Sequence, residues 1–286
     1  MPFTTLISTA DLASHLDDPN WTIVDCRFDL ANPELGAEQY RARHIPGAVY
    51  AHLDHDLSGP TTGKNGRHPL PGAEAFKARL GQWGIGEDVQ VVAYDQDNGM
   101  YASRLWWLLR YFGHDAVAVL NGGFARWQAE GRPVNDREVR REPRHAKRVG
   151  EPRRELRLTA ADVEMWRQLP NRRLIDARAP ERYRGESEPL DRVAGHIPSA
   201  LNHFYKNNLN PDGTFLAPEQ LRAQFQALLG EVSAENTALY CGSGVSAAHH
   251  LLAMEVAGLT GAKLYAGSWS EWCSDPARPV AVEPGT

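Results

Sequence analysis

The chain has few cysteines, no long apolar run and no excess of positive charge. Its three cysteines, Cys26, Cys241 and Cys273, cannot all pair and show no CxxC spacing. They therefore suggest neither a disulfide framework nor a zinc site, and each is treated as a free thiol. The formal net charge of −5 makes nucleic acid and anionic membrane surfaces poor partners, because an acidic protein repels both.

Targeting and membrane signals are also missing from the sequence. The first eight residues lack the basic region and apolar core of a signal peptide, and no apolar run approaches about 18 residues. We therefore expect a cytoplasmic protein with no membrane partner. An apolar fraction of 42% in 286 residues is enough for two domains of ordinary size.

The most informative feature of the sequence is an internal repeat. Four motifs recur in the same order at offsets of 151, 152, 146 and 144 residues; they pair Asp25 with Asp176, His44 with His196, Asp95 with Cys241 and Gly123 with Gly267. Each copy alternates short apolar runs with amphipathic stretches, such as the expected strand 237–240 before the expected helix 246–258. The pattern predicts an α/β fold of two tandem domains, each a parallel sheet flanked by helices on both faces.

The repeat sets the expected domain bounds at 1–131 and 158–286. Residues 132–157 between them form a basic stretch, which holds ten Lys or Arg against five Asp or Glu, with three prolines. Such a composition is typical of a linker. A nucleic-acid site there is the weaker interpretation, because acidic residues are interspersed and stacking aromatics are lacking.

Cys241 lies where an expected buried strand ends and a helix begins. In a parallel sheet this is the carboxyl edge, where ligands bind. The following loop, Cys-Gly-Ser-Gly-Val-Ser-Ala, has two glycines that allow backbone N–H groups to converge on one point. Converging N–H groups and a helix N-terminus favour an anion and would lower the pKa of the thiol. The structural alternative is a buried cysteine beside a tight turn.

This loop resembles the active-site loop of rhodaneses, and in detail that of 3-mercaptopyruvate sulfurtransferases. The resemblance extends through both Asp-x-Arg strand ends, both His-Ile-Pro elements and Trp269-Ser-Glu-Trp272. It implies two rhodanese-like domains, of which only the second carries a competent loop. Asp95 takes the place of the cysteine in the first copy, so that domain is expected to be catalytically inactive.

The resemblance implies transfer of sulfur through a persulfide on Cys241, with no metal or organic cofactor. The donor would be 3-mercaptopyruvate or thiosulfate, and the acceptor cyanide, a small thiol or a thioredoxin-like protein. In both the thiolate and the persulfide state of Cys241, N–H groups of the loop would hold the negative charge. The loop residues expected at the substrate are Gly242, Ser243, Gly244, Val245 and Ser246.

The resemblance also places Arg182, in Glu-Arg-Tyr-Arg-Gly, at the donor's carboxylate or sulfonate. The alternative is a surface arginine paired with Arg184. Mercaptopyruvate enzymes usually carry a second arginine in a following Glu-Pro-Arg, where this chain has Glu-Pro-Leu-Asp-Arg. Arg192 either replaces that arginine or faces solvent.

A relay of Ser243, His68 and Asp54 is a further implication of the mercaptopyruvate branch. Such a set could activate the acceptor and move protons in the second half-reaction, in a cleft lined by both halves of the chain. The alternatives are that His68 is a turn residue before prolines and that Asp56 or His55 takes the place of Asp54.

Three other functions fit the sequence less well. A cysteine-dependent phosphatase needs Cys-x5-Arg, and position 247 is alanine. A thiosulfate-preferring rhodanese carries cations inside the loop, whereas Gly242 and Ser243 are uncharged; the missing Glu-Pro-Arg keeps thiosulfate as the alternative donor. A rhodanese-like sulfur-carrier or interaction module commonly loses the cysteine, which this chain retains.

Overall fold

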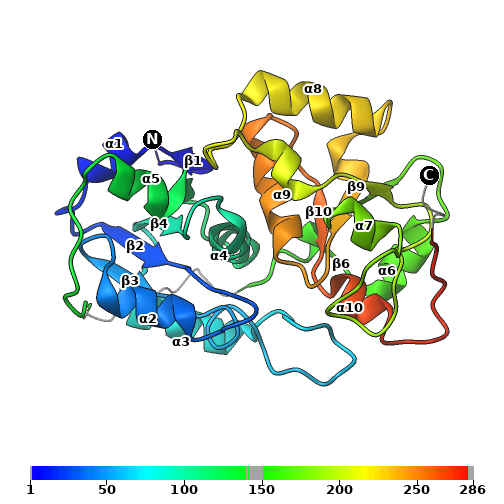
Figure 1. Cartoon of the computed structure of the whole chain (residues 1–286), viewed down its shortest axis with the longest axis horizontal. Helices are drawn as coiled ribbons and strands as arrows, with labels where there is room; N and C mark the ends of the chain where they lie inside the picture. Colours follow the sequence, from blue (N-terminus) through cyan, green and yellow to red (C-terminus); the bar gives the residue numbers. More distant parts are fainter. Residues whose placement is uncertain (1, 140, 142–150, 283–286) are drawn as a thin grey trace. The chain divides into compact units, whose positions relative to one another are not determined.

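The structure is a computed structural model that describes residues 2–139, 141 and 151–282. The chain divides into two compact units, and two short segments depart from sequence order. Pro60–Leu70 belongs to the second unit, with Arg154–Leu209 and Leu216–Thr286, and Asn210–Phe215 belongs to the first. Figure 1 shows the strands of each unit as arrows among their own helices.

The first unit contains a five-stranded sheet in the order β1-β5-β4-β2-β3, with every neighbouring pair parallel. Its strands are β1 (Leu6–Ile7), β2 (Trp21–Asp25), β3 (Ala48–Tyr50), β4 (Gln90–Tyr94) and β5 (Val117–Leu120). Its helices are α1 (Thr9–Ala13), α2 (Leu35–Ala42), α3 (Ala73–Gln82), α4 (Met100–Tyr111) and α5 (Gly123–Ala129).

The second unit repeats this arrangement in the order β6-β10-β9-β7-β8, again with parallel pairs. Its strands are β6 (Arg157–Leu158), β7 (Arg173–Asp176), β8 (Leu201–Asn202), β9 (Thr237–Tyr240) and β10 (Lys263–Tyr265). Its helices are α6 (Ala160–Trp166), α7 (Pro180–Tyr183), α8 (Pro218–Leu229), α9 (Ser246–Val256) and α10 (Ser268–Trp272), with 3-10 turns at Arg154–Leu156, Tyr205–Asn208 and Ala234–Asn236.

The two faces of the first sheet bury different helices. Alternate residues such as Val92 and Ala118 pack with Leu12 of α1 and with Phe124 and Trp127 of α5. The opposite face carries α4, which contacts β4 and β5. All five residues of β4 are buried, as expected for a central strand of a parallel sheet that is covered on both faces. The predicted α/β fold of two parallel sheets with helices is therefore confirmed.

Each copy of the repeat is held by a buried ion pair at the end of its second strand. Arg27 Nη2 lies 2.6 Å from Asp25 Oδ2, and Arg178 Nη2 lies 2.6 Å from Asp176 Oδ2. The same guanidinium groups donate to the carbonyl oxygens of Arg43 and Gly195, at 2.7 Å in both cases. Each ion pair therefore fixes the loop ahead of a His-Ile-Pro turn.

The described residues of the basic segment 132–157 divide between the units: those up to Arg153 belong to the first unit and residues 154–157 to the second. Asn135 forms an antiparallel bridge with His44, and Arg141 donates to the carbonyl oxygens of Trp21 and Gly47 at 3.0 Å. Residues 140 and 142–150, the middle of the expected linker, lie outside the described residues. Among the described residues, no helix has the length and apolarity needed to cross a bilayer.

Candidate active site

Cys241 follows the last residue of β9, an inner strand of the second sheet, and precedes α9. Its side chain is buried, with 2% of the residue exposed. The strand–loop–helix geometry predicted from the sequence therefore holds, and the thiol lies at the carboxyl edge of the sheet.

Backbone N–H groups surround the sulfur of Cys241. The Gly244 N–H donates to Sγ at 3.1 Å. Burial alone would raise the pKa of the thiol, but the Ser246 hydroxyl and the N–H groups of Ser243, Ala247 and Gly244 bring the pKa below its usual value. The loop thus stabilises the thiolate, the form of the sulfur that acts as a nucleophile.

The loop depends on close backbone packing. Gly244 has φ +79°, and a Cβ added there would lie 2.3 Å from the carbonyl oxygen of Ala266. The adjoining segment holds the loop from the other side, because Ser268 Oγ accepts from the Cys241 N–H at 3.1 Å. The Trp269 N–H donates to the Cys241 carbonyl oxygen at 3.0 Å. The start of α10 therefore fixes the position of Cys241.

His68 lies beside this loop. Its Nδ1 is 2.8 Å from Ser243 Oγ, and both residues are buried. The histidine comes from the segment Pro60–Leu70, which belongs to the same compact unit as Cys241. Two members of the predicted relay are thus in hydrogen-bond contact, although 175 residues separate them in sequence.

Arg182, at the C-terminal part of α7, also reaches the loop. Its Nη1 would lie 3.4 Å from a Cβ added at Gly242, the residue after the cysteine. Its Nη2 and Nε donate to the Glu188 carboxylate, with the shortest distance 2.7 Å. Arg184 instead pairs with Glu186 at 2.8 Å, and Arg192 is exposed.

Sequence reasoning missed Arg67. Its Nη2 would lie 2.8 Å from a Cβ at Gly242, and its Nη1 forms an ion pair with Asp191. The sequence did hold a weak signal, because Arg67 directly precedes the predicted His68. Nothing in the sequence indicated that Asp191 would contact it.

The corresponding loop of the first unit holds a carboxylate. Asp95 is buried and accepts from the N–H groups of Gly99, Tyr101 and Ala102 at 2.8 to 3.2 Å. Burial raises the pKa of Asp95 to about 6, although these N–H groups oppose the rise. The degenerate loop has therefore kept the N–H cradle around an anion that cannot carry sulfur.

Asp54, the third expected member of the relay, belongs to the first unit and is partly buried. Its N–H donates to Nδ1 of His52 at 3.1 Å. Its place in the relay stays a prediction.

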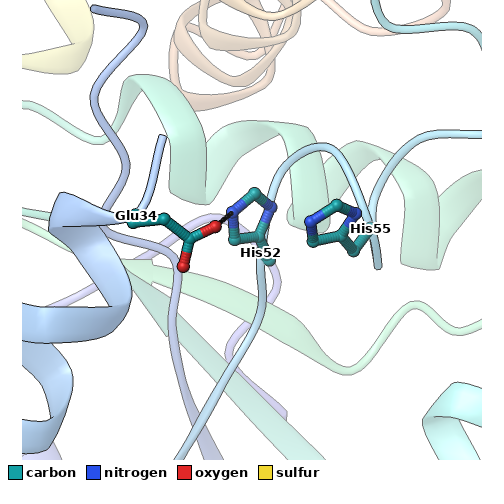
Figure 2. A group of neighbouring side chains, drawn as sticks. All are labelled: Glu34, His52 and His55. Atoms are coloured by element: carbon teal, nitrogen blue, oxygen red, sulfur yellow. Dashed lines mark ion pairs between the residues drawn. The ribbon is translucent and has the colours of Figure 1, made fainter. Parts of the chain in front are cut away.

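His52 is part of a cluster with Glu34 and His55, shown in Figure 2. The buried Nε2 of His52 faces Glu34 Oε1 at 3.9 Å, and the His52 and His55 rings stack with centroids 4.2 Å apart. Because Nδ1 accepts the Asp54 N–H, the neutral ring carries its proton on Nε2. The nitrogen that faces Glu34 then has no lone pair for a metal ion, and stacked rings do not converge on one. The cluster fits an imidazole N–H directed at a carboxylate better than a metal site.

The fold and the loop together define a tandem protein with one cysteine loop and one degenerate loop. The sequence model of the rhodanese-like domain matches residues 8–130 and 159–275. This chain belongs to the rhodanese family, of which it carries two domains.

Relatives cover nearly its whole length. A Pseudomonas aeruginosa protein named "Probable 3-mercaptopyruvate sulfurtransferase" is 45% identical over 279 residues, covering 97% of this chain and 98% of the relative. The thiosulfate sulfurtransferase of Cricetulus griseus is 36% identical, covering 93% and 91%. The crystal structure of SseA from Escherichia coli, described as a 3-mercaptopyruvate sulfotransferase, has a TM-score of 0.80 at 32% identity and covers 93% of this chain and 99% of that one.

Proposed function

We propose that this protein is a sulfurtransferase that moves a sulfane sulfur from 3-mercaptopyruvate to a thiol or cyanide acceptor through a persulfide on Cys241. The observation that carries the proposal is the buried Cys241 thiol: although burial raises its pKa, the Ser246 hydroxyl and the N–H groups of a loop without cations bring the pKa below its usual value. Relatives named as 3-mercaptopyruvate and thiosulfate sulfurtransferases support the reaction class.

In the first half-reaction the Cys241 thiolate attacks the donor sulfur. The new S–S bond forms as the C–S bond of mercaptopyruvate breaks, and its electron pair passes into the enolate of pyruvate. The proton of the donor thiol ends on that carbon, so the products are Cys241–S–S⁻ and pyruvate. The charge stays beside the Gly244 N–H, which can donate to either sulfur anion.

In the second half-reaction an acceptor thiolate or cyanide attacks the outer sulfur and restores the Cys241 thiolate. In this proposal His68, which is hydrogen-bonded to Ser243, takes the proton of an acceptor thiol. In this proposal Asp54 completes the relay by orienting the imidazole. The attacking form of cyanide is the anion, which carries no proton, so its attack does not need the relay.

The relay is tested by a His68→Gln variant in single-turnover experiments. We expect persulfide formation near the wild-type rate and transfer to a thiol acceptor slower by about 10²-fold, the usual contribution of a general base. Transfer to cyanide should change little. His15→Gln, at a partly buried histidine of the first unit that has no part in the relay, is the control. Equal slowing with thiol and cyanide would show that His68 supports the loop and does not move protons.

The choice of donor is tested by steady-state assays with mercaptopyruvate and thiosulfate. We expect kcat/KM for mercaptopyruvate to be at least about tenfold higher, which corresponds to about 1.4 kcal/mol of differential transition-state stabilisation. The loop has no cation to neutralise a dianionic donor, whereas a single carboxylate needs less compensation. A preference for thiosulfate would contradict mercaptopyruvate as the donor and favour thiosulfate, with the same persulfide chemistry on Cys241.

The cytoplasmic location belongs to the same proposal. Cell fractionation with an antibody against the native chain tests it.

A further inference from the structure

Two guanidinium groups lie close to Gly242, the residue that follows Cys241. A Cβ added at Gly242 would lie 2.8 Å from Arg67 Nη2 and 3.4 Å from Arg182 Nη1. Arg67 comes from the segment Pro60–Leu70 and Arg182 from α7, and both belong to the second unit. Both positive charges therefore lie next to the residue that carries sulfur.

Carboxylates hold the far sides of both arginines. Glu188, which has 3% of its side chain exposed, binds Arg182 through two nitrogens. Asp191, 6% exposed, forms an ion pair with Arg67 through Oδ1, and its Oδ2 lies 3.5 Å from Arg182 Nη2. Asp191 thus lies between the two guanidinium groups and sets their spacing.

The guanidinium nitrogens nearest Gly242 are those that do not pair with Glu188 or Asp191. Arg67 Nη2 and Arg182 Nη1 make no hydrogen bond within the described part of the chain, whereas the other terminal nitrogen of each is paired. An arginine that is oriented by a buried acid on one side and open on the other is preorganised to bind an oxyanion.

We infer that Arg67 is the second cation of the donor site and that Arg67 and Arg182 together bind the carboxylate of an α-keto acid donor. Asp191 is a positioning residue for both. The inference rests on the proposed function, and it supplies the second arginine that the segment after Arg182 lacks. The exposed Arg192 is not needed for this role.

The charge balance of the site favours a carboxylate donor over a dianion. Three guanidinium groups, of Arg67, Arg178 and Arg182, face three carboxylates, of Asp176, Glu188 and Asp191. The side chains therefore supply no net positive charge beyond the open N–H groups. A single carboxylate can be satisfied by directed hydrogen bonds, whereas thiosulfate would bring two negative charges to a balanced cluster.

The inference is tested with an Arg67→Leu variant and two donors, mercaptopyruvate and mercaptoacetone, in which a methyl group replaces the carboxylate. Loss of a charged hydrogen bond of about 1.5–3 kcal/mol predicts a KM for mercaptopyruvate about 10- to 100-fold higher. The kinetics with mercaptoacetone should stay within about twofold, because that donor has no carboxylate to lose. Lys64→Gln, an exposed residue of the same segment, is the matched control, and Arg67→Lys should recover part of the affinity.

An equal change with both donors, or none with either, would overturn the role of Arg67. Affinity for pyruvate, measured by calorimetry in the Cys241→Ser background, separates this failure from failure of the proposed function. We expect Arg67→Leu to weaken pyruvate binding by at least about tenfold whether or not the enzyme turns over mercaptopyruvate. Unchanged pyruvate affinity contradicts the inference alone, whereas a wild-type enzyme inactive with mercaptopyruvate contradicts the proposed donor.

Discussion

Replacing Cys241 with serine is expected to lower sulfur transfer by at least about 10³-fold with either donor, as loss of a nucleophile does in other covalent enzymes. The substitution changes one atom and keeps the buried volume. The serine hydroxyl, however, is neutral at pH 7 and cannot store sulfur as a persulfide. Steady-state rates with mercaptopyruvate and thiosulfate provide the measurement.

Cys273→Ser is the matched control for this substitution. Cys273 is partly buried, and burial together with the negative charge of Asp191 raises the pKa of its thiol. The control should keep its activity within about twofold, as is usual for a substitution outside the reacting groups. Turnover that survived in Cys241→Ser and fell in Cys273→Ser would show that the chemistry belongs to Cys273 and not to Cys241.

Gly244→Ala is expected to reduce activity by about 10²-fold or more, comparable to the loss of an oxyanion-hole donor. A Cβ at this position would meet the carbonyl oxygen of Ala266 at 2.3 Å, so the loop must shift and the Gly244 N–H must leave Cys241 Sγ. Losing this donor removes part of the stabilisation of the thiolate. The pKa of Cys241 should then rise, and the pH dependence of its alkylation by iodoacetamide should move to higher pH.

Gly63→Ala is the control that separates the cost of a positive φ from the clash with Ala266. Gly63 also has φ +79°, but nothing lies within 4 Å of a Cβ added there. Both variants bear the cost of a non-glycine residue at positive φ, roughly 1 kcal/mol, while only Gly244→Ala displaces the loop. If Gly244→Ala kept the wild-type alkylation profile, the N–H cradle would not be the cause of the lowered pKa.

Most of the fold could be predicted from periodicity and from the repeat. The expected strand before Cys241 coincides with β9, because an apolar run bounded by a polar segment and a glycine loop has little freedom of register. The expected helix after it runs from Ser246 to Val256, two residues shorter than predicted. Helix ends depend on local capping, which periodicity does not determine.

The location of Pro60–Leu70 could not be predicted. This segment lies within the first repeat in sequence but in the second compact unit. Its placement depends on contacts across about 200 residues, such as the Arg67 N–H with Ser270 Oγ at 3.1 Å. A hydrophobic pattern carries no information on such polar contacts, because they bury little apolar surface.

The candidate site, like the fold, could be predicted from the sequence only in part. Cys241 and its loop were found because the chemistry needs a thiol and converging N–H groups in consecutive residues. His68 was found only through the family resemblance, and Arg67 was not found at all. An arginine in a loop looks like any solvated cation until a structure shows which carboxylate orients it.

The central claim is a persulfide on Cys241, and intact-mass spectrometry after donor addition tests it most directly. The protein treated with mercaptopyruvate should gain about 32 Da, one sulfur atom, and lose it on addition of cyanide. Peptide mapping should place the added sulfur on Cys241, and the Cys241→Ser protein should show no gain. Turnover without any adduct, or an adduct confined to Cys26 or Cys273, would contradict the account.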